Sequence, residues 1–83
     1  MTMDENWAIP AERVRQFFSQ QPDVVRTGEG FANRDCRILL TPLRGQPLGQ
    51  WELPRTRIQI EGGGEAVREI YRRFFLRFLS AGG

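Results

Sequence analysis

The sequence contains no histidine, no lysine and a single cysteine among its 83 residues. Histidine is the commonest general base and the commonest metal ligand in proteins, so its absence excludes Ser-His-Asp and Cys-His nucleophile systems and the usual zinc sites. Cys36 cannot form an intramolecular disulfide by itself. The sequence therefore does not indicate an oxidising compartment, and we expect a cytoplasmic protein.

Long apolar runs are also missing. No run in the sequence approaches the roughly 18–20 apolar residues of a membrane-spanning helix, so we expect no membrane span. The first ten residues, MTMDENWAIP, carry two acidic residues and no basic one, unlike the basic head of a secretory signal. The length suits one domain with a thin core.

All twelve basic residues are arginines. One interpretation is selection for the planar guanidinium group, which binds carboxylate and phosphate through two parallel hydrogen bonds. The other is a coding bias toward arginine in the source genome, and the sequence does not separate the two. The formal net charge of +2 is too small to indicate nucleic-acid binding unless the charge is concentrated on one face.

Hydrophobic periodicity predicts a short lead-in followed by one compact domain. Residues 1–8 have no clear period and are predicted to be a flexible lead-in, and residues 9–80 are predicted to form a single domain. Its expected elements are a helix over 10–21, strands over 24–31, 35–41 and 51–61, and a helix over 65–80. Pro42 is expected to end the second strand or to make it an edge strand, and LRGQPLGQ after it reads as a loop. Residues 50–53 are either an extension of the third strand or a separate short strand.

The order helix, three strands, helix predicts an α+β fold. With short connections between the strands, we expect a two-layer α-β-β-β-α arrangement, in which both helices cover one face of a three-stranded antiparallel sheet. This order resembles that of double-stranded-RNA-binding domains. Those domains begin their last helix with a lysine-rich segment, whereas this chain has the acidic GGGEAVRE there, so no binding residues are transferred from the resemblance.

The last helix carries a core stripe at helical spacing. Val67, Ile70, Tyr71, Phe74 and Phe78 fall on one side of the helix, and arginines occupy much of the rest. The mixture of arginine and aromatic residues in YRRFFLRFLS is therefore explained by one buried face and one solvated face.

Three apolar residues of this helix lie outside the core stripe. Phe75, Leu76 and Leu79 are too far around the helix to share the same contact with the sheet. They require a second cover, which is the first helix, the segment around Trp7, or another protein chain. We predict a protein interface at these three residues with Arg72 at its rim, formed with a second copy or with a protein partner.

The alternative function is nucleic-acid binding. Alternation along the strands places Arg37, Arg55 and Arg57 on the outer face of the sheet, and Arg73 on the last helix completes a candidate patch for phosphate groups or nucleic acid. A solvated sheet face explains the same residues without any ligand.

No residue pattern predicts catalysis. The remaining acidic residues show no characteristic spacing, so we expect no enzyme activity, no cofactor and no metal site. A small-molecule site around Trp51 and Tyr71 is the weakest of the binding hypotheses. The sequence predicts a small accessory protein that acts by binding another protein, and it does not name a partner or a pathway.

Overall fold

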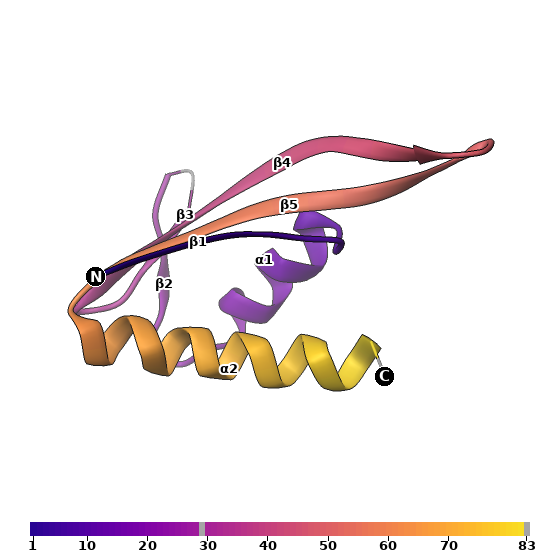
Figure 1. The fold of residues 1–83 in the computed structure, drawn as a ribbon. Helices are drawn as coiled ribbons and strands as arrows, with labels where there is room; N and C mark the ends of the chain where they lie inside the picture. Colours follow the sequence, from indigo (N-terminus) through magenta and orange to yellow (C-terminus); the bar gives the residue numbers. More distant parts are fainter. Residues whose placement is uncertain (29, 83) are drawn as a thin grey trace.

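The computed structural model describes residues 1–28 and 30–82, and in them it contains two helices and five strands. In chain order these are β1 (Thr2–Trp7), α1 (Ala11–Ser19), β2 (Val25–Arg26), β3 (Gly30–Ala32), β4 (Cys36–Leu48), β5 (Trp51–Gly62) and α2 (Gly64–Gly82). The strands form one antiparallel sheet in the order β1-β5-β4-β3-β2. Both helices cover the same face of the sheet (Figure 1), and the predicted α+β class is confirmed.

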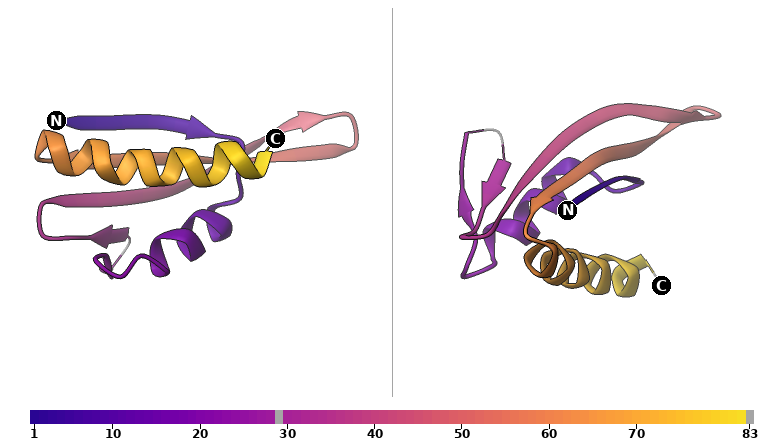
Figure 2. Two further views of the ribbon diagram at one scale, coloured as in Figure 1. Left: turned by 90° about the horizontal axis from the view of Figure 1, so that it is seen from below. Right: turned by 60° about the vertical axis from the view of Figure 1, so that its left-hand side comes forward.

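The predicted three-stranded sheet is wrong, because residues 1–8 and 24–31 contribute strands that the sequence pattern did not resolve. Residues 2–7 are not a flexible lead-in but the edge strand β1, which pairs with β5 from Thr2↔Glu61 to Trp7↔Thr56. Residues 24–31 are not one bent strand but contain β2 and the start of β3. The element order is therefore not that of a double-stranded-RNA-binding domain. Figure 2 shows β1 alongside β5 and above α2.

A long hairpin replaces the predicted loop after residue 42. β4 runs through Pro42 and Pro47 to Leu48, and β5 begins at Trp51, so residues 43–54 form a two-stranded arm that projects beyond the helices (Figure 1). A bulge between Leu43 and Gln46 interrupts the register of the arm. Residues 51–53 belong to β5, so this segment is an extension of the third predicted strand and not a separate short strand.

Prolines are tolerated in this hairpin because their nitrogens face the free edges of the sheet. The backbone N–H of Asn33 donates to the Cys36 carbonyl at 3.0 Å, so the backbone of Cys36 faces β3. Backbone groups alternate in direction along a strand, and Pro42 therefore faces the same side, beyond Gly30, the first residue of β3. Leu48 and Trp51 close the hairpin, and their backbone groups face each other. Because the direction alternates along each strand, the nitrogens of Pro47 and Pro54 point away from the partner strand.

The glycines at 28 and 30 mark a tight hairpin and not a bend within one strand. Thr27 and Gly30 exchange backbone hydrogen bonds of 2.9 and 3.3 Å, which close the β2–β3 hairpin. A Cβ atom on Gly30 would collide with the backbone carbonyl of Ile38. Only glycine allows β3 to approach β4 this closely.

The core lies between the sheet and the two helices. The alternation predicted for both long strands is confirmed, since Ile38 and Leu40 of β4 and Ile58 and Ile60 of β5 are buried while their neighbours face outward. The stripe predicted on α2 is also confirmed, with Tyr71 at its half-buried margin. The core residues of the helices are Val14, Phe17, Phe18, Val67, Ile70, Phe74 and Phe78.

Replacing Phe74 by alanine should destabilise the fold severely. Phe74 is fully buried, and its ring lies 4.9 Å from the ring of Phe78 and 6.2 Å from that of Phe18. We expect Phe74→Ala to lower the free energy of unfolding by about 3–5 kcal/mol, measured by urea denaturation. Arg68→Ala, at an exposed position on the same helix and outside the apolar residues in question, is the control and should change it by less than about 1 kcal/mol. Equal effects of the two substitutions would contradict this assignment of the core.

Candidate protein-binding surface

The apolar residues of α2 outside the core stripe are covered only in part. The Phe75 ring is half-buried and packs edge-on against Trp7 of β1, with ring centroids 5.9 Å apart, and lies 5.8 Å from Tyr71. Leu76 and Leu79 remain 49% and 55% exposed. Of the three covers considered from the sequence, the Trp7 segment therefore accounts for Phe75 and leaves the two leucines in solvent.

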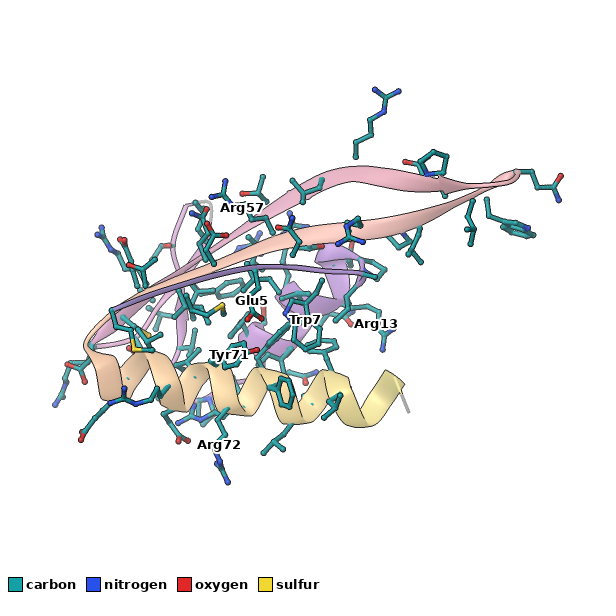
Figure 3. The ribbon with its side chains drawn as sticks, viewed as in Figure 1. Glu5, Trp7, Arg13, Arg57, Tyr71 and Arg72 are labelled. Carbon is teal, nitrogen blue, oxygen red and sulfur yellow. The ribbon has the colours of Figure 1, made fainter. Side chains whose placement is uncertain are left out.

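A carboxylate fixes the position of this aromatic cover. The Tyr71 hydroxyl and the Trp7 indole N–H both donate to Oε1 of Glu5, each at 2.9 Å. Figure 3 shows the three side chains pointing toward one another between β1 and α2, while Arg72 points away from the sheet. Partial burial, followed by the hydrogen bond to Glu5 and the charge of Glu5, raises the pKa of Tyr71 above its usual value. The cluster ties the edge strand to the last helix.

A second apolar surface lies at the end of the β4–β5 arm. Leu48 and Trp51 face each other across the two strands and are 63% and 72% exposed, and Leu53 follows on the same face of β5 with 38% exposure. The turn between them is Gly49–Gln50, in which only Gly49 has a positive φ, of 64°. Glycine at the first central position is the pattern of a type II′ hairpin turn. We refer to Leu48, Trp51 and Leu53 as the hairpin tip.

The hairpin tip was missed from the sequence because its prolines and glycines resemble those of a loop. A signal was nevertheless present, since Gly49–Gln50 lies between apolar residues and a glycine in the first position of a two-residue loop is typical of tight hairpins. Trp51 lies seven residues before Ile58, the partner of Glu5, which is about 23 Å along an extended strand. Trp51 and Tyr71 therefore do not line one small-molecule site.

The four arginines of the predicted anion patch do not gather in one place. Register places Arg37, Arg55 and Arg57 on the outer face of the sheet, whereas Arg73 lies on α2. Two of the three outer arginines, Arg37 and Arg57, form ion pairs with carboxylates. Arg37 contacts Glu61 at 2.7 Å.

Arg57 makes two hydrogen bonds to Asp4, of 2.9 and 2.6 Å, and these lower the pKa of that carboxyl group. Arg73 contacts Asp23 at 2.8 Å and Glu69 at 3.2 Å. Neighbouring carboxylates thus offset the charge of three of the four arginines.

Cys36 is an inner-face residue of β4. Its side chain is buried, and burial raises the pKa of its thiol, as does the nearby charge of Asp35. A thiol with a raised pKa is a poor nucleophile at neutral pH, and this environment is typical of a structural cysteine. In residues 1–28 and 30–82, no group of three cysteine or acidic side chains is placed to hold a metal ion. Within the same residues, no helix is long and apolar enough to cross a membrane.

The contact between Tyr71 and Glu5 can be measured directly, because Tyr71 is the only tyrosine in the chain. A spectrophotometric titration of the phenol should give a midpoint above the usual pKa of about 10. The raised pKa of Tyr71 means that its contribution to stability is present below the unfolded pKa and is lost as the pH rises through the folded one.

Glu5→Gln should move this midpoint downward, and burial should keep it above the usual value. Glu65→Gln removes a carboxylate elsewhere in the chain and should leave the midpoint unchanged. A midpoint that does not respond to Glu5→Gln would rule out the hydrogen bond.

Comparison of the chain with protein-family models and with curated proteins finds no match.

Proposed function

We propose that this protein is a small non-catalytic accessory protein that acts through protein–protein contacts. The observation that supports this function is the exposure of large apolar side chains in two places, the hairpin tip and the C-terminal helix face, which we define as Leu76 and Leu79 with Phe75 and Arg72 at its margin. Aromatic residues and arginine are enriched at protein interfaces; the hairpin tip carries Trp51, and the C-terminal helix face has Phe75 and Arg72 at its margin.

The form of the arm favours recognition by side chains. An isolated two-stranded hairpin is only marginally stable in water, and residues 43–54 have no third strand beside them in the described chain. Proline nitrogens at 47 and 54 remove donors from its free edges, which disfavours pairing with another strand. A partner that covers Leu48 and Trp51 would therefore bury side chains without extending the sheet along this arm.

The C-terminal helix face suits self-association in particular. Leu76 and Leu79 are three residues apart and so lie on neighbouring turns of the same side of α2. In a two-fold dimer the same patch is used by both copies, so two such faces can bury each other. A protein partner that offers its own apolar patch would use the same residues.

Nucleic-acid binding remains the alternative function. It has less support than protein binding, because Arg37, Arg57 and Arg73 of the predicted patch form ion pairs with carboxylates of the chain itself. Salt dependence separates the two functions, because binding to phosphate weakens steeply with salt whereas an apolar interface responds little.

Sedimentation velocity over a wide concentration range tests the proposal. We expect the wild-type chain to self-associate, and we expect Leu76→Glu combined with Leu79→Glu to weaken the association at least about tenfold, since two charges would enter an apolar interface. Val25→Glu is the control, because Val25 is 64% exposed on β2 and belongs to neither surface.

Trp51→Ser, measured by the same sedimentation experiment, tests whether the hairpin tip contributes to the association. A wild-type chain that stays monomeric would rule out the dimer. If it also bound labelled RNA or DNA with an affinity that falls steeply between low and physiological salt, the alternative function would replace the proposed one.

A further inference from the structure

A groove runs between α1 and the free edge of β4. Its volume is about 840 Å³, within the range of binding clefts in proteins. One wall is the side of α1 that carries Arg15, Gln16 and Ser19. The other wall is β4 from Leu39 to Pro42, and the end of the groove is formed by the β2–β3 hairpin. None of its lining residues belongs to the hairpin tip or to the C-terminal helix face.

The groove exists because β3 is much shorter than β4. β3 pairs with β4 only from Gly30↔Leu39 to Ala32↔Arg37, so beyond Leu39 no described strand lies on this side of β4. α1 packs on β4 and β5 and passes beside the unpaired stretch. The groove lies between the helix and this unpaired part of the sheet edge.

The backbone of β4 offers hydrogen-bonding groups to this gap. Backbone direction alternates from Cys36, which faces β3, so the N–H and carbonyl of Leu40 and the carbonyl of Pro42 point into it. Pro42 supplies no donor. An extended segment that runs along this stretch of β4 can therefore form up to three backbone hydrogen bonds with it, one as acceptor and two as donor.

The charge of the groove selects the kind of segment. Arg15 on α1 and Arg26 on β2 both line it, and neither makes an ion pair with a described residue. Glu12 is the one acidic side chain among the described lining residues. Guanidinium groups bind carboxylates through paired, charge-assisted hydrogen bonds, so the lining favours acidic side chains. Gln16, Ser19 and Gln20 add neutral polar groups along the helix wall.

We propose that this groove binds an extended acidic peptide segment of another protein, which adds a short strand to the edge of β4. Main-chain hydrogen bonds to Leu40 and Pro42 would hold the segment, and Arg15 and Arg26 would select its carboxylates. Strand addition beside a helix is a recurrent mode of peptide recognition. Pro42 confines the added strand to the part of the edge nearest β3. This site is separate from the surfaces of the proposed function and can fail or succeed independently of them.

An NMR titration with a defined peptide tests the proposal. The probe is an acetylated hexapeptide that alternates aspartate and valine, compared with its lysine–valine counterpart and with a backbone N-methylated aspartate–valine peptide. We expect the acidic peptide to bind at least about tenfold more tightly than either of the others. The amide of Leu40 should gain protection from hydrogen exchange, while the amide of Thr41, which faces β5, should change little.

Matched arginine variants localise the charge effect. Arg15→Gln and Arg26→Gln should each weaken binding of the acidic peptide about three- to tenfold. Arg68→Gln on α2 removes the same charge outside the groove and should leave binding unchanged. Because the N-methylated peptide is tested on the wild-type chain, the role of the β4 edge is measured even if a variant does not fold.

Three results would overturn the proposal. The first is no binding of the acidic peptide at millimolar concentration, and the second is equal binding of the lysine peptide. The third is that inorganic phosphate perturbs the same amides while N-methylation has no effect, which would identify a site for free anions in place of a peptide site. Perturbations confined to Trp51, Leu76 and Leu79 would place peptide binding on the surfaces of the proposed function and would likewise exclude the groove.

Discussion

The ring of Phe74 contacts aromatic side chains from three separate elements, and the arrangement of the whole domain depends on that contact. Trp7 of β1 lies 4.9 Å from it, Phe17 and Phe18 of α1 lie 6.2 Å from it, and Phe78 continues the cluster along α2. A chain of this length has one thin core, so few other contacts could hold two helices and an edge strand on the same sheet. The surfaces proposed for binding are the parts of the chain that this cluster does not reach.

The free edges of the sheet separate two kinds of recognition. In the arm of residues 43–54, where Pro47 and Pro54 turn their nitrogens outward, an edge does not accept a new strand easily, and the contact proposed there is made by exposed side chains. Between Leu39 and Pro42 the edge retains the donor of Leu40 and lies beside the arginines of α1 and β2. The modes of binding proposed for the hairpin tip and for the groove thus differ because prolines stand at the outward positions of the arm, whereas Leu40 stands at the outward position beside the groove.

The periodic segments could be predicted from the sequence, and the short or interrupted ones could not. Alternation in RTRIQIE and the stripe from Val67 to Phe78 predicted both the elements and their buried faces, because burial of one face imposes that period. The sequence pattern does not predict β1, because MDEN has little intrinsic strand preference and its partner strand β5 lies about 50–60 residues further along the chain. Local composition predicts a loop in place of the arm, because strand register sets the direction of a proline nitrogen and composition does not contain the register.

The candidate sites divide in the same way. By itself the sequence determined that Phe75, Leu76 and Leu79 lie outside the core stripe, since helical geometry fixes their direction relative to it. It also determined that histidine-dependent chemistry is absent. Only the tertiary structure decided that Trp7 covers Phe75 and that a groove opens beside β4. It also decided that Glu61 and Asp4 form ion pairs with Arg37 and Arg57 on the outer face of the sheet. The physical reason is that these contacts join residues far apart in the chain, whose proximity arises from sheet pairing and not from local spacing.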